Sequence, residues 1–319
     1  MNGKDCGRKK PELLIPAGGP EALQAAVSAG ADAVYLGGDA FSLRAKAKNF
    51  SKEEMREGIA CARENDVRVY VTVNAFAHES DLTDVEVYLA SLVPLSPDAL
   101  IIADPGVFSL ARRICPELPV HLSTQANNLN HESCLFWYDL GVRRIVLARE
   151  LSLTEIAAIR AAVPDDLELE CFVHGAVCMA YSGRCHISKY LTGRDANAGN
   201  CTQSCRWNYT VVEEKRPGEY FPVEETERGT AVFAAKDLCM IGHIPELLQA
   251  GIGAFKIEGR TKTASYVRKV TEAYRQAIDD YFSDASVYRA RIPEYLQQLR
   301  EGASREFDTG FYLHEGRMV

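Results

Sequence analysis

The 319-residue chain has no run of about 20 consecutive apolar residues, the length that a helix needs to cross a bilayer. Residues 1–11 are mostly polar and lack the apolar core of a secretory signal peptide. We therefore expect a cytoplasmic protein with no membrane partner. The chain also lacks an excess of positive charge, because its net charge is −8. A general electrostatic attraction to nucleic acid is excluded, whereas a local basic patch is not.

Three common enzyme motifs are missing as well. The Gly-x-Ser-x-Gly elbow of α/β-hydrolases does not occur. His78 has no second histidine four residues later, so the helix motif of zinc proteases is absent. Gly251 and Gly253 open a strand rather than a helix, unlike the glycines of a dinucleotide-binding fold. These absences disfavour a serine hydrolase, a zinc protease of this type and a Rossmann enzyme.

What the sequence does contain is a repeated unit of helix, turn and short apolar strand. Residues 28–38 show it, because a glycine-terminated helix is followed by Ala33-Val34-Tyr35-Leu36 and two glycines. Continuous apolar runs are typical of parallel strands that are buried on both faces. Eight such units favour a closed (β/α)8 barrel of the TIM type over an open doubly wound sheet. The expected strands are residues 12–17, 33–38, 67–74, 99–104, 119–124, 144–149, 167–173 and 254–258.

The seventh connection breaks this rhythm and divides the chain. Residues 174–241 show no clear barrel elements, so we expect an insertion after the seventh strand. Inside it, a hairpin is expected to pair residues 209–213 with 230–235. Residues 1–11 should form a flexible arm and residues 12–281 the barrel. Residues 282–319 should form a helical extension that leads toward a further small β domain.

The insertion also concentrates cysteine. Of the ten cysteines, five lie between residues 178 and 239, and a reducing cytosol disfavours structural disulfides. Structural zinc sites usually carry cysteine pairs two to four residues apart, and only Cys201 and Cys205 come near that spacing. The wide, uneven spacing favours an iron–sulfur cluster, with zinc or no metal as alternatives. The expected ligands are Cys178, Cys185, Cys201 and Cys239, and Cys205 competes with Cys201.

Polar residues follow the expected strands, at the end where (β/α)8 enzymes place their active sites. Guanidinium groups bind carboxylates in a fork geometry, so Arg44, Arg149 and Arg260 would suit a small polycarboxylate co-substrate. Basic and aromatic side chains near the cysteines would hold an unstacked nucleotide, with a solvated surface as the alternative. The expected catalytic residues are His174, Arg149, Glu258 and Arg260. The expected substrate-binding residues are Arg44, Asn74, Gln125, Arg184, Arg206 and Trp207.

Two stretches around the first cysteines resemble the signature of a known family. Residues 170–178 read Glu-Cys-Phe-Val-His-Gly-Ala-Val-Cys, and residues 181–188 read Tyr-Ser-Gly-Arg-Cys-His-Ile-Ser. Together they resemble the collagenase-like peptidase family U32. The resemblance covers residues 12–312 and includes shorter blocks at residues 14–18, 35–38, 71–74, 123–125, 149–150, 201–207 and 256–260.

The resemblance implies an oxygen-independent hydroxylase with a 4Fe–4S cluster on four cysteines. Family members hydroxylate the wobble uridine of tRNA, a cytidine of ribosomal RNA or the ubiquinone ring, and prephenate is thought to supply the hydroxyl group for the RNA members. For this chain it implies ligation by Cys178, Cys185, one of Cys201 and Cys205, and Cys239. The run at residues 200–207 looks closest to the tRNA branch. This predicts that the chain forms 5-hydroxyuridine in tRNA, with prephenate as hydroxyl donor.

Two other functions are also compatible with the sequence. The family name records a peptidase, which would need a cysteine nucleophile such as Cys178 activated by His174 or His186. Hydrogen-bonding roles for these histidines are the simpler interpretation. The third function is that of a cluster-bearing subunit in a quinone hydroxylation complex. The oligomeric state is left open.

Overall fold

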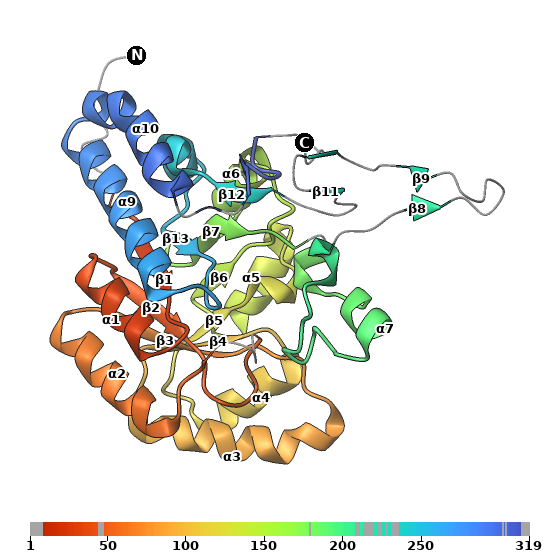
Figure 1. Cartoon of the computed structure of the whole chain (residues 1–319). Helices are drawn as coiled ribbons and strands as arrows, with labels where there is room; N and C mark the ends of the chain where they lie inside the picture. Colours follow the sequence, from red (N-terminus) through yellow and green to blue (C-terminus); the bar gives the residue numbers. More distant parts are fainter. Residues whose placement is uncertain are drawn as a thin grey trace.

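The computed structural model describes residues 9–43, 48–178, 180–207, 211–212, 220–221, 225–226, 229–230, 236–301, 303 and 305–313. Eight parallel strands form a closed barrel, because β13 pairs with both β7 and β1 (Figure 1). The predicted (β/α)8 fold is confirmed, and the ends of each predicted strand shift by at most three residues. The barrel strands are β1 (Glu12–Pro16), β2 (Ala33–Leu36), β3 (Arg68–Val73), β4 (Ala99–Ile102), β5 (Val120–Leu122), β6 (Arg144–Val146), β7 (Glu168–Ala176) and β13 (Ala254–Ile257).

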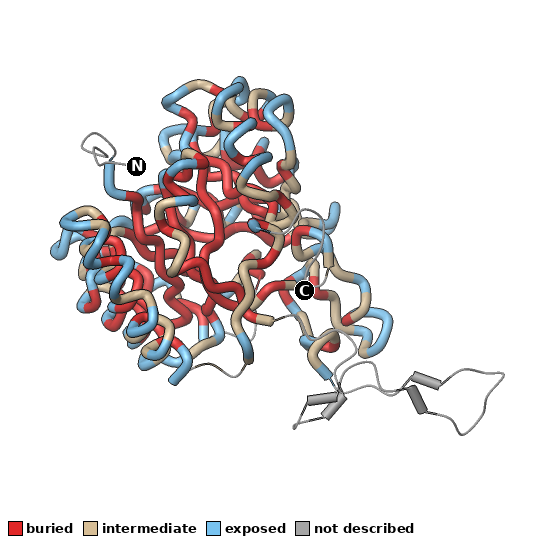
Figure 2. The backbone as a smooth tube through the Cα atoms, turned by 90° about the horizontal axis from the view of Figure 1, so that it is seen from above, coloured by how far each residue is buried: buried red, intermediate tan, exposed pale blue. Residues whose placement is uncertain are grey.

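Helices cover the outside of the barrel, and Figure 2 shows the buried residues concentrated in the strands they enclose. Side-chain caps explain where several helices begin. Ser51 and Ser152 each form a capping box with a glutamate three residues later, at the starts of α2 and α6. Asp104 caps α4 in front of Pro105. The helices are α1 (Pro20–Ser28), α2 (Lys52–Glu64), α3 (Leu82–Leu92), α4 (Pro105–Ile114), α5 (His131–Asp139), α6 (Leu153–Ala162), α8 (Ile244–Gln249), α9 (Ala264–Ser283) and α10 (Ala285–Arg300).

The inside of the barrel holds charged residues as well as apolar ones. Arg144 donates to both oxygens of Glu12, at 2.5 and 3.2 Å, and lies 3.4 Å from Glu170. Lys256 donates to the other oxygen of Glu170 at 2.8 Å, and Tyr70 donates to Glu12 at 3.0 Å. All five residues are buried, so every charge among them depends on its partners. We refer to these five residues as the interior network.

The seventh strand is longer than predicted. It runs to Ala176, and β12 (Asp237–Cys239) lies antiparallel beside it with Cys239 opposite His174. The predicted insertion, residues 174–241, therefore begins within β7 and ends two residues after β12. The extension predicted as helical also returns to the sheet, because β14 (Phe307–Asp308) pairs in parallel with β12. Strands of two or three residues are too short to show a periodic pattern, which is why the sequence did not reveal them.

The insertion contains α7 (Ile187–Thr192) and two short antiparallel strand pairs. β8 (Val211–Val212) pairs with β9 (Tyr220–Phe221), and β10 (Glu225–Thr226) pairs with β11 (Gly229–Thr230). The predicted hairpin between residues 209–213 and 230–235 lies mostly outside the described residues, and its described part, Val211–Val212, pairs with Tyr220–Phe221. The observed pairs join segments that are closer in sequence, and shorter loops cost less chain entropy to close. In the part of the chain that the structure describes, no helix has the length and apolar character of a membrane span.

Replacing Arg144 by methionine should destabilise the fold by about 3–5 kcal/mol, because two buried carboxylates would lose the cation between them. Urea denaturation would measure the free energy of unfolding. Arg143→Met is the matched control, since Arg143 is the adjacent arginine and is exposed. We expect the control to cost less than about 1 kcal/mol. Equal losses in the two variants would contradict the role given to the interior network.

Candidate functional site

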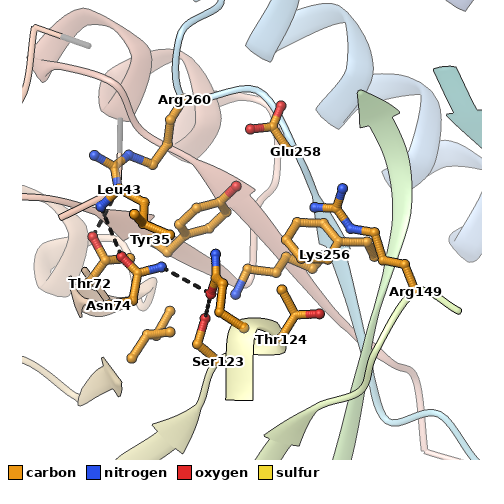
Figure 3. Close-up of a pocket in the computed structure, with 13 residues that line it drawn as sticks. Tyr35, Leu43, Thr72, Asn74, Ser123, Thr124, Arg149, Lys256, Glu258 and Arg260 are labelled. Carbon is orange, nitrogen blue, oxygen red and sulfur yellow. Dashed lines mark hydrogen bonds between the residues drawn. The ribbon is translucent and has the colours of Figure 1, made fainter. Parts of the chain in front are cut away.

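A pocket lies at the carboxyl ends of the barrel strands, where enzymes of this fold carry out their chemistry (Figure 3). It contains about 440 Å³ of space between its atoms, part of which is open solvent. The structure brings together here five of the residues expected from the sequence. The lining residues are Tyr35, Leu43, Thr72, Asn74, Ile101, Ser123, Thr124, Gln125, Arg149, Phe172, Lys256, Glu258 and Arg260.

Arg260 forms one side of this pocket and is held firmly. Its guanidinium donates to Ser42 at 2.5 Å, to Thr72 at 2.9 Å and to Asn49 at 2.8 Å. Gly37 makes this possible, because a Cβ atom at that position would lie 2.6 Å from Arg260 Nη2. Arg260 therefore gives the pocket a fixed positive charge, while several of its N–H groups already bind protein oxygens.

Arg149 lies on another side, stacked on Phe172 with its Cζ atom 3.9 Å from the ring centroid. Its Nη1 atom donates to the carbonyl of Ala176 at 3.0 Å. Its Nε atom is buried and has no hydrogen-bond partner among the described residues. Figure 3 draws Glu258 between Arg149 and Arg260. Because an unpaired buried N–H group is costly, Arg149 is well placed to bind an acceptor on a ligand.

Lys256 is part of the lining that sequence reasoning missed. Its ammonium group lies 4.6 Å from the ring centroid of Tyr35 and 5.5 Å from that of Phe172, and it donates to Glu170. The side chain is almost fully buried, and this burial lowers the pKa of Lys256. A signal was available, since Lys256 is the one charged residue in the otherwise apolar strand Ala254–Ile257.

Neutral polar groups face these cations from β3 and from the turn after β5. The amide of Asn74 donates to Gln125 at 3.5 Å, and the hydroxyl of Ser123 donates to the same oxygen of Gln125. Asn74 also accepts from the backbone N–H of Leu43 at 3.1 Å. The pocket thus combines a cationic side with an amide side, as a site for an oxygen-rich anion would require.

Two residues expected at the site are placed differently. His174 is only 2% exposed and does not line the pocket; its ring packs against Tyr274 and Phe307, each 5.5 Å away between centroids. Burial lowers the pKa of His174 to about 3, so it is neutral at pH 7. The catalytic role predicted for it is not supported by this position, because a residue at a strand end can face outward as well as inward. Arg44 lies outside the described residues.

Four cysteines of the insertion gather next to the barrel: Cys178 after β7, Cys185 before α7, and Cys201 and Cys205 around a short turn at Ser204–Arg206. Burial raises the pKa of Cys205, and the negative charges of Cys178, Cys201 and Cys185 raise it further. This interaction requires neighbouring sulfur atoms. These four thiols are free, although within the described residues no three His, Cys, Asp or Glu side chains form a ready-made metal site.

Cys239, the fourth ligand expected from the sequence, lies apart from this group. Its thiol contacts the hydroxyl of Tyr274, and burial raises the pKa of Cys239 to about 11. Cys239 pairs with His174 across the sheet, while Cys178 is four residues further along the chain. β7 ends at Ala176, so Cys178 lies beyond the strand with which Cys239 pairs. The arrangement favours Cys205 over Cys239, opposite to the preference from spacing.

The insertion is attached to the pocket rim through specific bonds. Glu150 accepts from the backbone N–H of Ser182 at 2.5 Å and from its hydroxyl at 3.1 Å. The same hydroxyl donates to Asn127 at 2.6 Å. Arg184, expected to bind substrate, instead donates to the backbone carbonyl of Gln125 at 2.9 Å. These bonds fix the cysteine-bearing turn directly above the pocket residues that follow β5.

Beyond this attachment, the insertion exposes aromatic side chains. Trp207, which the sequence suggested as a substrate-binding residue, is 44% exposed, and Tyr190 of α7 is 88% exposed. Arg206 lies beside Trp207 and donates to the carbonyl of Val177 at 3.3 Å. The sequence suggested Trp207 and Arg206, whereas Tyr190 was missed because a tyrosine in a short helix more often packs inward.

Comparison with known proteins shows that the sequence matches a known family. A sequence profile described as peptidase family U32 matches residues 18–318. The chain is 42% identical over 312 residues to "tRNA hydroxylation protein P1" of Bacillus subtilis, covering 98% of this chain and 73% of that protein. It is 38% identical over 268 residues to a 23S rRNA 5-hydroxycytidine synthase of Escherichia coli, covering 84% of this chain and 39% of that protein.

Among solved structures, the chain resembles the U32 peptidase Mk0906 with a TM-score of 0.50 and 16% sequence identity. The match covers 81% of this chain and 97% of that one. At this identity the likeness supports the barrel fold and nothing finer.

The buried histidine predicts a pH dependence of stability. An unfolded histidine binds a proton near pH 6.5, whereas folded His174 does so only near pH 3, so protons favour the unfolded state between these values. Its contribution is complete above about pH 6.5, and about 2 kcal/mol of it should be lost by pH 5. Urea denaturation at pH 7.5 and pH 5 would measure the loss.

His174→Leu should reduce this loss by about 2 kcal/mol, because the titrating group is gone. His131→Gln, at an exposed histidine of α5, is the control and should leave the pH dependence unchanged. The assignment fails if the leucine variant loses as much stability as the parent between the two pH values.

Proposed function

The chain belongs to peptidase family U32, and on this basis we propose that it is an oxygen-independent RNA hydroxylase acting in the cytoplasm. Its substrate is the wobble uridine of tRNA, which it converts to 5-hydroxyuridine. The observation that carries the proposal is the coincidence of a cationic pocket and four clustered thiols at one barrel mouth. The two relatives above, whose names describe hydroxylation of tRNA and of ribosomal RNA, support the reaction class.

In this proposal the cysteines hold a 4Fe–4S cluster. Cys178, Cys185 and Cys201 supply three thiolates, and the fourth comes from Cys205 in the arrangement seen here. Thiolates are the donors that such clusters need, and free thiols drawn from separate segments suit a cluster better than a two-knuckle zinc site. When bound, the cluster would supply one-electron chemistry at the pocket rim. Arg206, next to Cys205, lowers the cost of gathering negative sulfur atoms.

The pocket below would bind prephenate as the hydroxyl donor. Prephenate carries two carboxylates, and the lining has three cationic side chains, Arg149, Lys256 and Arg260, against the single carboxylate of Glu258. Asn74 and Gln125 supply amide groups that can orient a hydroxyl group. These residues bind and orient; none of them needs to act as a nucleophile.

The insertion would hold the RNA. Between residues 178 and 207 the chain has four basic side chains and one acidic side chain, although the whole chain is acidic. Exposed Trp207 and Tyr190 offer surfaces for base stacking beside these charges. A modifying enzyme must take its target base out of the stack, and these exposed aromatic side chains would receive it. A peptidase is less well supported, because His174 packs away from the pocket.

Deleting the gene should remove 5-hydroxyuridine from tRNA, as measured by mass spectrometry of nucleosides from the deletion strain. The parent chain should restore it, and Arg149→Gln should restore far less because the co-substrate would lose a cation. Glu21→Gln, on the outer face of α1, is the control and should restore it fully. An unchanged nucleoside profile in the deletion strain would refute the proposed substrate.

The cluster predicts a second result, on protein purified without oxygen. Cys178→Ser, Cys185→Ser and Cys201→Ser should each lose most of the iron and the visible absorption of the parent, since three thiolates hold a cluster poorly. Cys205→Ser should behave like them, and Cys239→Ser should keep its iron. The reverse result for the last two would make Cys239 the fourth ligand. Parent protein without iron and sulfide would refute the cluster altogether.

A further inference from the structure

Two cationic side chains of the pocket lining, Lys256 and Arg149, donate fewer hydrogen bonds to the described residues than they could. Lys256 can donate three hydrogen bonds, and within the described residues it donates one, to Glu170 at 2.8 Å. Arg149 donates one, to Ala176, and its buried Nε atom has no partner in the same part of the chain. Arg260 differs, because Ser42, Thr72 and Asn49 already accept from it.

These two cations share one aromatic ring. The Cζ atom of Arg149 lies 3.9 Å from the ring centroid of Phe172, and the Nζ atom of Lys256 lies 5.5 Å from the same centroid. Tyr35 contacts Lys256 from another side, with its centroid 4.6 Å from Nζ. The rings restrict the positions of both charges, so the two N–H donor groups are held near each other without a ligand.

Glu170, the carboxylate that pairs with Lys256, also lies beside a second cation inside the barrel. Glu170 accepts from Lys256 through one oxygen and lies 3.4 Å from Arg144 through the other. Glu170 therefore divides its negative charge between two cations and does not fully neutralise Lys256. Within the pocket lining, Glu258 is the one carboxylate, against the three cationic side chains of Arg149, Lys256 and Arg260. The lining thus carries a net positive charge.

We propose that Arg149 and Lys256 form a subsite for a carboxylate in the pocket. Lys256 makes this subsite specific for small carboxylic acids. This rests on the proposed function, because the same pocket holds the hydroxyl donor. Lys256 lines the pocket but is only 4% exposed, so the subsite would admit a small acid more readily than a phosphate within an RNA strand. The guanidinium and ammonium groups bind the carboxylate oxygens, and Phe172 packs against the rest of the acid.

Isothermal titration calorimetry on anaerobically purified protein would test the subsite, with prephenate, phenylpyruvate and phenylacetone as probes. Phenylacetone matches phenylpyruvate except for the carboxylate, so it should bind much more weakly to the parent. The double variant Lys256→Met/Glu170→Gln removes both buried charges together and avoids an unpaired carboxylate. It should bind prephenate and phenylpyruvate about ten- to a hundredfold more weakly, the loss of one charge-assisted hydrogen bond.

Lys262→Gln is the matched control, since Lys262 stacks on Tyr266 and is not part of the pocket lining. It should keep the parental affinities, and binding should be compared at a temperature at which thermal melting shows the parent and each variant to be folded. In turnover assays the double variant should raise the KM for prephenate and leave the KM for tRNA unchanged, which a merely structural defect would not do.

Parental affinity of the double variant for prephenate would overturn the proposal, and so would equal binding of phenylacetone and phenylpyruvate by the parent. The two proposals can fail separately. If carboxylates bind through Lys256 but no 5-hydroxyuridine forms, the subsite stands and the RNA reaction falls. If 5-hydroxyuridine forms with the double variant as with the parent, the reaction stands and the subsite falls.

Discussion

The buried ion pairs inside the barrel are the constraint on which the rest of the site depends. Glu12, Arg144, Glu170 and Lys256 come from four strands, and each is buried where an unpaired charge would be very costly. Their mutual contacts therefore require the strands to close in one register. One member of this network, Lys256, also lines the pocket, so the contacts that close the fold also influence the electrostatics of the site.

The position of the insertion depends on a second, smaller set of contacts. Glu150 and Asn127 hold Ser182, and the backbone of Gln125 accepts from Arg184. Asn127 and Ser182 both adopt positive φ angles, which are rare for residues other than glycine and are maintained here by these bonds. The pocket and the cysteine-bearing insertion are thus joined through Asn127, Glu150 and the backbone of Gln125.

Much of the site follows from position along the chain. Asn74, Gln125, Arg149, Glu258 and Arg260 were expected because they follow apolar strands, and closure of the barrel brings all such ends to one mouth. The same rule fails for His174, because a register shift in β7 between Phe172 and His174 interrupts the alternation and leaves this side chain facing α9. It also overlooks Lys256, which lies within its strand and reaches the pocket through the length of its side chain.

By itself, the sequence determined the fold class, the place of the insertion and the residue types of the site. Apolar runs, turn residues and cysteine spacing are local features, and they express the requirements of a closed parallel barrel. Only the tertiary structure decided which charged groups neutralise each other, which way His174 faces and which thiols gather. Those outcomes depend on pairing between residues far apart in the chain. An antiparallel register that no local pattern encodes sets Cys239 opposite His174. The fold of the insertion brings Cys205 close to Cys178.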